Sequence, residues 1–183
     1  IRIKGANIES IIGGIIEIFH KFNIKIERDK EDLVVYGSNN LKIDAKNSGF
    51  PVANEDMPKL VPRPWPGFPV DVLPVMVTLA SKTEGRILIQ NWMYETGLDF
   101  IHELNSMGAN IFMCDQQRVI VSGPVKFKGG NVTSPGIIQA CKAIFLASLA
   151  DDVETVITGV DILKRRYPNV FEIYKSLGAD ISI

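Results

Sequence analysis

Asp71 stands in a setting that could present a carboxylate for proton transfer. It ends the run Pro64-Trp-Pro-Gly-Phe-Pro-Val-Asp71 and begins an apolar stretch that predicts a helix over 71–82. Unpaired N–H groups at a helix N-terminus carry partial positive charge and favour an ionised carboxylate. Such a carboxylate can accept a proton from a hydroxyl within hydrogen-bond reach. An aspartate at this place also commonly serves only as a helix cap, so the residues alone leave both roles open.

A basic cluster, Lys164-Arg165-Arg166, precedes another predicted helix, over 167–176. Guanidinium groups suit the recognition of phosphate and carboxylate oxygens, because their planar fork of donors matches the geometry of those groups. The cluster could therefore bind an anionic ligand, and a solvated basic loop is the alternative.

The histidines and cysteines show no spacing typical of a metal site. His20 and His102 lie on separate predicted helices, and Cys114 and Cys141 form no C-x-x-C pattern. We expect both histidines at or near the surface and Cys141 among apolar core neighbours. No metal or organic cofactor is predicted.

Two further features have a functional and a structural interpretation. Trp65 and Trp92 could stack on a sugar or a nucleobase, but we expect both to be packed in the interior. Gly129-Gly130 lacks the spacing of a phosphate-binding loop and predicts a plain turn.

The composition disfavours several classes of protein. Hydrophobic residues make up 46% and charged residues 22% of the 183 residues, as in globular domains, and the formal net charge is −1. This charge disfavours nucleic acid as a partner. No apolar run approaches the roughly 20 residues of a membrane span, and no signal segment opens the chain. We therefore expect a cytoplasmic protein with reduced thiols. Because the sequence starts at Ile1, inside a predicted strand, we expect a piece of a longer protein.

An internal repeat sets the predicted architecture. Three segments each predict the end of an amphipathic helix, then a turn residue, then a strand: 14–26, 101–111 and 171–181. Asn23, Gly108 and Gly178 take the same place in these segments. Both residue types tolerate the left-handed conformation that ends many helices, so the three segments predict one repeated unit.

A second repeated segment supports this prediction. Leu79-Ala80-Ser81 and Leu146-Ala147-Ser148 each end an apolar helical stretch and precede a β-branched strand. The sequence thus predicts an α/β fold of three units, over about 1–62, 63–124 and 125–183. The first unit lacks a leading helix such as 71–82, and we expect it to be incomplete.

The predicted elements are short and alternate along the chain. Helices are predicted over 8–21, 71–82, 97–107, 136–149 and 167–176. Strands are predicted near 1–4, 23–28, 32–37, 41–45, 86–90, 109–114, 118–122, 154–159 and 178–183. Residues 46–69 are rich in proline, glycine and asparagine and predict an irregular segment, either a surface linker or a site loop that delivers Asp71.

Three motifs resemble those of the UDP-N-acetylglucosamine enolpyruvyl transferases. The run that ends at Asp71 resembles the family's Pro-x-Pro-Gly-Phe-Pro-Thr-Asp signature. The stretch from Tyr94-Glu95 to Met107-Gly108-Ala109 resembles Phe-Glu-Asn-Arg-Phe…Glu-Leu-x-x-Met-Gly-Ala, and Arg165-Arg166-Tyr167…Leu177-Gly178-Ala179 is similar to Asp-Arg-Gly-Tyr-Glu…Leu-Gly-Ala. The motifs keep the family's order and spacing, whereas residues before 60 match only in pattern.

The resemblance implies a fold and a reaction. Members have two domains, each built from three βαβαββ units as an inside-out α/β barrel, and this chain matches the C-terminal domain. The implied reaction transfers the enolpyruvyl group of phosphoenolpyruvate to the 3-hydroxyl of UDP-N-acetylglucosamine, in peptidoglycan precursor synthesis for the cell wall. The second domain supplies a reactive cysteine loop and a lysine for phosphoenolpyruvate, so this chain alone is expected to be inactive.

The resemblance also assigns roles to three residues. Asp71 matches the aspartate that contacts the sugar 3-hydroxyl and acts as general base. Arg165 matches an arginine that contacts the phosphate-bearing substrate. Met93 matches a position whose backbone contacts the sugar.

The sequence departs from the family at cationic positions. Gly97 and Gln139 stand where the family has arginine, and Val70 stands where it has threonine before the aspartate. Weaker electrostatic stabilisation of an anionic substrate follows. Two alternatives stay open: a divergent or non-catalytic homologue that binds a phosphorylated sugar or a partner protein, and a 3-phosphoshikimate enolpyruvyl transferase. The Pro-Gly-Phe-Pro-x-Asp and Met-Gly-Ala motifs favour the UDP-sugar type.

Overall fold

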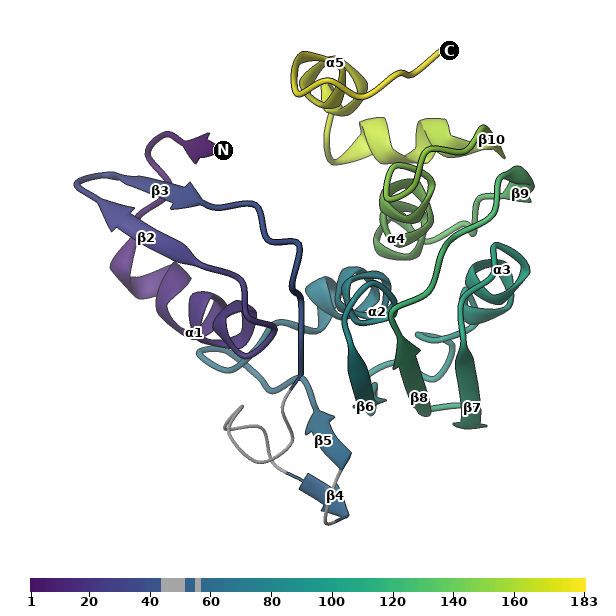
Figure 1. Ribbon diagram of the computed structural model, residues 1–183, viewed down its shortest axis with the longest axis horizontal. Coiled ribbons are helices and arrows are strands. Elements are labelled where there is room, and N and C mark those ends of the chain that lie inside the picture. The colour runs from purple at the N-terminus through teal and green to yellow at the C-terminus, as the bar shows by residue number, and fades with distance from the viewer. Residues whose placement is uncertain (44–51, 55–56) are drawn as a thin grey trace.

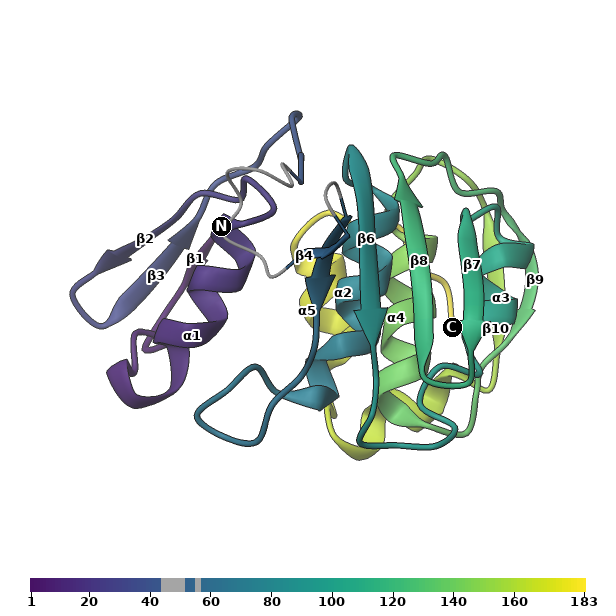
Figure 2. The ribbon, with the colours of Figure 1, turned by 90° about the horizontal axis from the view of Figure 1, so that it is seen from below.

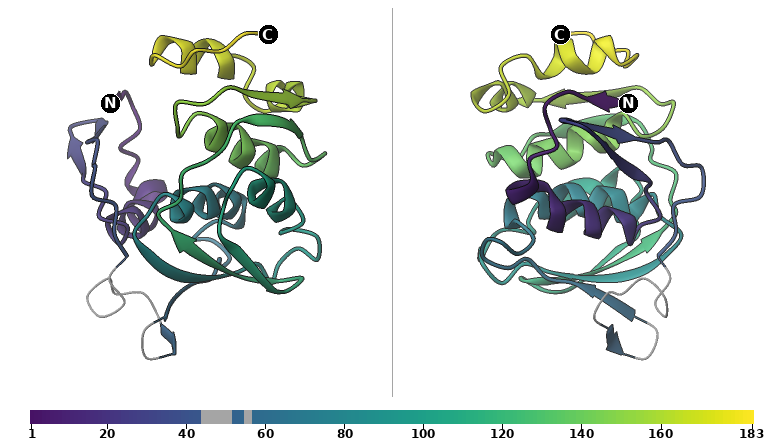
Figure 3. Two further views of the ribbon diagram at one scale, coloured as in Figure 1. Left: turned by 45° about the vertical axis from the view of Figure 1, so that its right-hand side comes forward. Right: turned by 90° about the vertical axis from the view of Figure 1, so that its left-hand side faces the viewer.

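The computed structural model describes residues 1–43, 52–54 and 57–183, and it shows a mixed α/β protein (Figure 1). Within these residues the strands form a three-stranded, a five-stranded and a two-stranded sheet. Helix α2 (Leu73–Ser81) lies against one face of the five-stranded sheet, and α4 (Ile138–Ser148) packs on the other side of α2 (Figure 1 and Figure 2). The C-terminus lies on the far side of these helices from that sheet (Figure 3).

The N-terminal part forms an antiparallel sheet beside one helix. Its elements are β1 (Arg2–Ile3), α1 (Glu9–His20), β2 (Ile26–Asp29) and β3 (Asp32–Val35), with strand order β1-β3-β2. Ile8 is the N-cap residue of α1 and makes no side-chain cap bond. The Asn7 amide instead donates to the Lys30 carbonyl at 2.6 Å, which ties the helix start to the β2–β3 turn.

The middle part has a βαβαββ order. Its elements are β5 (Met57–Leu60), α2, β6 (Gly85–Gln90), α3 (Ile101–Ser106), β7 (Ile111–Asp115) and β8 (Arg118–Gly123). Strands β5 and β6 are parallel, and β8 runs antiparallel between β6 and β7. The short strand β4 (Val52–Asn54) extends the edge next to β5. In this topology β5 groups with α2 and β6, a few residues before the unit boundary that the sequence predicts.

The C-terminal part repeats the first half of that order. Strand β9 (Gly130–Thr133), α4 and β10 (Thr155–Thr158) form a second parallel βαβ arrangement, followed by the 3-10 helix η2 (Val160–Arg165) and α5 (Val170–Ser176). The N-terminal part has the same order as the second half of the middle part: β1, α1, β2 and β3 correspond to β6, α3, β7 and β8.

Several predicted elements differ from the structure. Residues 178–183 form no strand, and Gly130 begins β9 where a plain turn was expected. The irregular segment predicted over 46–69 contains β5 and β4. Its residues 46–51 and 55–56, and the end of the strand predicted over 41–45, lie outside the described residues.

Three helix ends have the left-handed conformation that the sequence predicts. Asn23, Gly108 and Gly178 have φ angles of 60°, 95° and 101°. After each of them, the next N–H bonds back five residues, at 3.2 Å from Ile24 and at 3.0 Å from both Ala109 and Ala179. The same left-handed ending thus directs three helices into the segments that follow.

The core holds α2 against α4. Helix α2 is buried on nearly all sides, as a helix enclosed between a sheet and another helix should be. Thr78 donates its hydroxyl to the Ala143 carbonyl at 2.9 Å. At the far end of both helices, Lys82 binds the two Asp151 oxygens at 2.9 and 2.7 Å. These contacts fix the relative position of the two helix starts. In the described part of the chain, no helix is long and apolar enough to cross a membrane.

Candidate functional site

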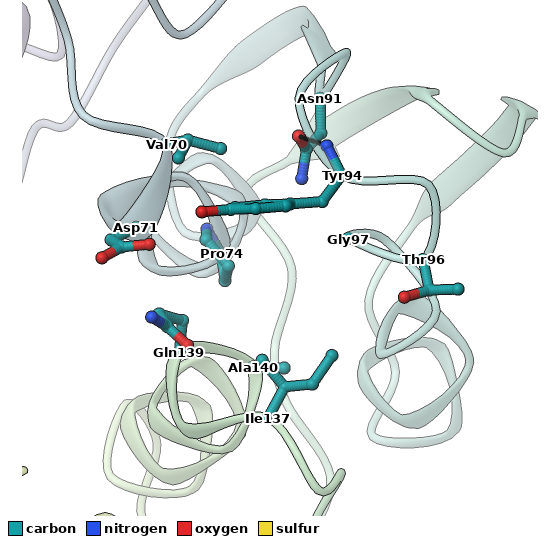
Figure 4. A pocket seen from close by; sticks show the side chains of 10 residues that line it. All are labelled: Val70, Asp71, Pro74, Asn91, Tyr94, Thr96, Gly97, Ile137, Gln139 and Ala140. Carbon is teal, nitrogen blue, oxygen red and sulfur yellow. Dashed lines mark hydrogen bonds between the residues drawn. The ribbon is translucent and has the colours of Figure 1, made fainter. Parts of the chain in front are cut away.

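A pocket of about 310 Å³ opens between the starts of α2 and α4 (Figure 4). The loop that follows β6 forms its third wall. It is lined by Val70, Asp71, Pro74, Asn91, Tyr94, Thr96, Gly97, Ile137, Gln139 and Ala140. This volume is at the small end of the range for ligand sites.

The proline-rich loop sets the position of Asp71. Gly67 donates to the Pro64 carbonyl at 2.8 Å, and Arg63 donates to the Phe68 carbonyl at 3.0 Å, which closes the loop on itself. A Cβ on Gly67 would lie 2.4 Å from the Arg63 Cβ, so only glycine fits this turn. Phe68 is buried and anchors the loop to the core. Val70 and Asp71, two and three residues after Phe68, line the pocket.

Asp71 lies in a single 3-10 turn, η1 (Val70–Val72), immediately before α2. Pro74 occupies the first turn of α2, where its missing N–H costs no helical hydrogen bond. The Asp71 carboxylate makes no hydrogen bond to a backbone N–H of the described residues, and its contact there is the Arg166 guanidinium at 3.3 Å. Its side chain is 39% exposed. The structure thus argues against the helix-cap alternative for Asp71.

Asn91 organises the loop after β6. Its carbonyl Oδ1 accepts from the N–H groups of Met93 and Tyr94, each at 3.3 Å, while its own N–H donates to the Gln117 carbonyl at 2.7 Å. The side chain is only 2% exposed, and a Cβ on Gly97 would lie 2.0 Å from Asn91 Nδ2. The glycine at position 97 therefore makes room for this buried amide.

The Tyr94 ring lies across the pocket above Pro74, and its hydroxyl points toward Val70 and Asp71 (Figure 4). Tyr94 is 52% exposed, and its hydroxyl makes no hydrogen bond to a described residue. Tyr94 therefore offers both a ring face and a free hydroxyl to a ligand in this pocket.

The start of α4 contributes uncapped backbone donors. Ile137 is the N-cap residue and makes no side-chain cap bond. The first hydrogen bond of this helix is from Cys141 to the Ile137 carbonyl at 2.9 Å, and in the described chain the N–H groups of residues 138–140 have no acceptor. Two helix N-termini thus face the pocket, and their partial positive charge favours an anionic ligand.

The structure brings four of the positions singled out in the sequence into one place. The pocket is lined by Val70, Asp71, Gly97 and Gln139, which come from three separate parts of the chain. Met93 is outside the lining and 37% exposed. Arg165 is exposed, and none of the described residues pairs with it. The cation that contacts Asp71 is Arg166. The sequence predicted the basic cluster that contains it but did not single out this residue.

The remaining candidates are placed as follows. Trp65 and Trp92 are 56% and 45% exposed, so the prediction that both are packed in the interior is wrong. Trp92 Nε1 donates to the Pro62 carbonyl at 2.9 Å, which holds the ring beside the proline-rich loop. His20 and His102 are exposed, as expected.

Cys141 is buried in a core cluster with Phe145 and Phe171, as expected, and burial raises the pKa of its thiol. Among the described residues, no group of three or more histidine, cysteine or acidic side chains could hold a metal ion.

The comparisons with known sequences point to one family. The family model of EPSP synthase (3-phosphoshikimate 1-carboxyvinyltransferase) matches residues 1–174. The chain is 34% identical over 163 residues to a UDP-N-acetylglucosamine 1-carboxyvinyltransferase of Bradyrhizobium diazoefficiens. It is 32% identical over 185 aligned positions to a protein of the same name from Bacteroides fragilis strain YCH46. These alignments cover 89% and 100% of the chain but 36% and 41% of the relatives.

Solved structures share the fold. The enolpyruvyl transferase NikO from Streptomyces tendae superposes with a TM-score of 0.81 at 21% identity, covering 99% of this chain and 39% of that one. EPSP synthase from Acinetobacter baumannii superposes with a TM-score of 0.67 at 17% identity, covering 93% and 40%. The chain therefore spans about two fifths of the length of the proteins it matches.

Proposed function

The chain belongs to the enolpyruvyl transferase family, and we propose that it forms the general-base side of an active site for UDP-N-acetylglucosamine. In this proposal the enolpyruvyl group passes from phosphoenolpyruvate to the 3-hydroxyl of the sugar. The observation that carries the proposal is the placement of Asp71, a carboxylate without a backbone partner in the described chain, at a pocket that two helix N-termini face.

Asp71 has the chemistry that the transfer needs on the acceptor side. The acceptor O–H bond and the C–O bond between the enolpyruvyl carbon and phosphate both break, and a new C–O bond joins that carbon to the acceptor. Inorganic phosphate leaves, and the hydroxyl proton needs a base. A carboxylate within hydrogen-bond reach of the hydroxyl can take that proton as the oxygen attacks.

The helix starts supply electrostatic support for the anionic groups of both substrates. The uncapped N–H groups of residues 138–140 and the start of α2 direct partial positive charge at the pocket. Such fixed donors stabilise negative charge without reorganisation during the reaction. Because Gly97 and Gln139 carry no charge, this support depends more on the backbone than it would with arginines at those positions.

A second domain is part of the proposal. The chain spans about two fifths of the length of the curated relatives. In the proposal it forms an inside-out barrel that supplies one wall of a cleft, and the second domain supplies the other wall. The proposal includes a cytoplasmic location and a role in peptidoglycan precursor synthesis. The unpaired thiols Cys114 and Cys141 fit a reducing compartment.

The test is a phosphate-release assay on the protein expressed from its complete gene, with every residue that the gene encodes on either side of this chain. Phosphate release is expected only when phosphoenolpyruvate and UDP-N-acetylglucosamine are both present. Release that requires 3-phosphoshikimate instead would reassign the acceptor within the family. The 183-residue chain by itself is expected to release no phosphate with either acceptor.

The neutral residues Gly97 and Gln139 in the pocket favour one second candidate, a homologue that binds a phosphorylated sugar without turnover. Calorimetric titration with UDP-N-acetylglucosamine separates the two functions. Binding together with phosphate release supports the transferase, and binding without release under any acceptor supports the non-catalytic homologue.

A further inference from the structure

The Tyr94 hydroxyl is a polar group inside the candidate site that has no partner among the described residues. Tyr94 is 52% exposed and lines the pocket, and its hydroxyl makes no hydrogen bond to a described residue. Figure 4 shows this hydroxyl directed toward Val70 and Asp71. The phenol of Tyr36, by contrast, donates to the Glu27 carboxylate at 2.7 Å. Tyr94 therefore keeps a free donor on the side of the proposed base.

Backbone contacts hold Tyr94 in this position. Its N–H donates to Asn91 Oδ1 and its carbonyl accepts from the Gly97 N–H, both at 3.3 Å. Asn91 is 2% exposed, so the first contact anchors the loop in the interior. A Cβ on Gly97 would lie 3.2 Å from the Tyr94 Cβ, and glycine therefore lets the loop fold this tightly. The ring then lies above Pro74, which sets its hydroxyl near the start of α2 (Figure 4).

The wall next to Asp71 has no hydroxyl of its own. The preceding residue, Val70, lines the pocket with an apolar side chain, whereas the motif that this run resembles has threonine there. Position 94 shows the opposite exchange, because the motif that begins at Tyr94 has phenylalanine in its first place. Among the described lining residues the other hydroxyl belongs to Thr96, which lies on the far side of the pocket from Asp71 (Figure 4). One hydroxyl is thus missing beside the carboxylate, and another, from a different part of the chain, points to the same place.

An alcohol placed between these two groups can use both of them. A hydroxyl group has one donor and two acceptor lone pairs. Its proton can go to the Asp71 carboxylate, and one lone pair can accept from the Tyr94 O–H, which leaves the second lone pair free to form the new C–O bond. Tyr94 keeps its own proton throughout, so the proton balance of the proposed reaction is unchanged. The phenol holds the alcohol oxygen in place while the carboxylate takes the proton.

We propose that the Tyr94 hydroxyl binds the oxygen of the acceptor alcohol beside Asp71, in place of the hydroxyl that Val70 does not supply. This inference rests on the proposed function and adds one more side chain that contacts the acceptor. It requires that the pocket hold one hydroxyl next to Asp71, and that either position 70 or position 94 can carry it.

The experiment exchanges the two hydroxyl positions in the protein expressed from its complete gene. Tyr94→Phe keeps the ring and removes one hydrogen bond, so the KM for the acceptor is expected to rise about 3- to 10-fold, with the KM for phosphoenolpyruvate changed less than about twofold. Val70→Thr replaces a methyl group by a hydroxyl on a side chain of similar shape, and the double variant Val70→Thr/Tyr94→Phe is expected to recover most of the acceptor KM. Tyr36→Phe is the matched control, because it removes a phenol hydroxyl outside the pocket. Its KM values should match the wild type.

The acceptor KM gives the decisive comparison. An unchanged acceptor KM in Tyr94→Phe, or a rise that Val70→Thr does not recover, overturns the inference and leaves the proposed function standing. Absence of phosphate release in the wild type counts against the proposed function. In that case the inference is tested by calorimetric titration of UDP-N-acetylglucosamine into the wild type and the variants. A Kd that is raised in Tyr94→Phe and recovered in the double variant supports it, whereas equal Kd values or no binding in the wild type overturn it.

Discussion

The starts of α2 and α4 face the same pocket, and each follows a strand of a parallel βαβ arrangement. They differ in what they bring to it. The start of α2 brings the Asp71 carboxylate on a 3-10 turn, whereas the start of α4 brings Gln139 and uncapped N–H groups. The fold thus places two similar helix starts at one pocket. Only the start of α2 carries a carboxylate, Asp71, which makes it the candidate base.

The largest expected effect comes from removing the carboxylate at the start of α2. Asp71→Asn removes the proposed base and keeps the shape of the side chain, so turnover is expected to fall about 100- to 10,000-fold. The melting temperature should stay within a few degrees, because the exposed pair with Arg166 contributes at most about 1 kcal/mol. Steady-state phosphate release and thermal melting check both parts.

The control for this substitution is Asp99→Asn, which makes the same chemical change at an exposed residue outside the pocket. Its turnover should match the wild type. An Asp71→Asn protein that melts early yet keeps its turnover would show that the aspartate is structural, and the contrast between the helix starts would lose its functional meaning.

The left-handed helix endings could be predicted from the sequence because they are local features. Asn23, Gly108 and Gly178 mark the same left-handed helix ending, and such an ending needs only a residue that tolerates positive φ. Asp71 was predicted at a helix start for a similar reason, since the preceding prolines and the apolar run both lie within a few residues of it.

Features that depend on distant partners were missed. Strand β5 (Met57–Leu60) contains a proline and shows little alternation, and it exists because β6 pairs with it. The predicted strand over 178–183 has suitable residues but no neighbouring strand among the described residues. Arg166 could not be distinguished from Arg165, because its contact with Asp71 joins two elements far apart in the chain.

The second prediction concerns what keeps the helix starts side by side. Asp151 is 11% exposed and holds Lys82 at the ends of α2 and α4, and it also accepts from the Phe127 N–H at 2.8 Å. Asp151→Asn leaves a partly buried ammonium without its counter-charge. We expect a loss of about 2 kcal/mol in the free energy of unfolding, measured by urea denaturation.

Glu84→Gln is the matched control, because Glu84 pairs with Lys42 at 3.4 Å with both side chains more than half exposed. A change below about 0.5 kcal/mol is expected there. Equal losses in the two variants would mean that burial of the Lys82–Asp151 pair has no special part in joining the helices.

The same pair predicts a pH dependence of stability. Burial by itself raises the pKa of the Asp151 carboxyl, but the hydrogen bonds from Lys82 and from the Phe127 N–H outweigh it and leave the pKa below its ordinary value of 3.8. A lowered pKa in the folded state stabilises the protein above the unfolded pKa, and this stability is lost as the pH falls through the folded one. The stability gap between the wild type and Asp151→Asn should therefore be constant above about pH 5 and shrink toward pH 3. A gap that does not change over this range would contradict the ionic nature of the contact.

The smallest expected effect comes from placing a positive charge at the start of α4. Gln139 lines the pocket near Asp71 and occupies a position where the family has arginine. Gln139→Arg is expected to lower the KM for phosphoenolpyruvate about tenfold, equivalent to roughly 1.4 kcal/mol. The stronger version of the test combines it with Arg166→Ala. If the pocket needs one more positive charge and not a particular residue, Gln139→Arg should lower the KM for phosphoenolpyruvate by a similar factor whether or not Arg166 is present. If Gln139→Arg lowers this KM in the wild type but not in the Arg166→Ala protein, the position of the cation next to Asp71 matters more than its charge. The difference between the two helix starts would then be geometric as well as electrostatic.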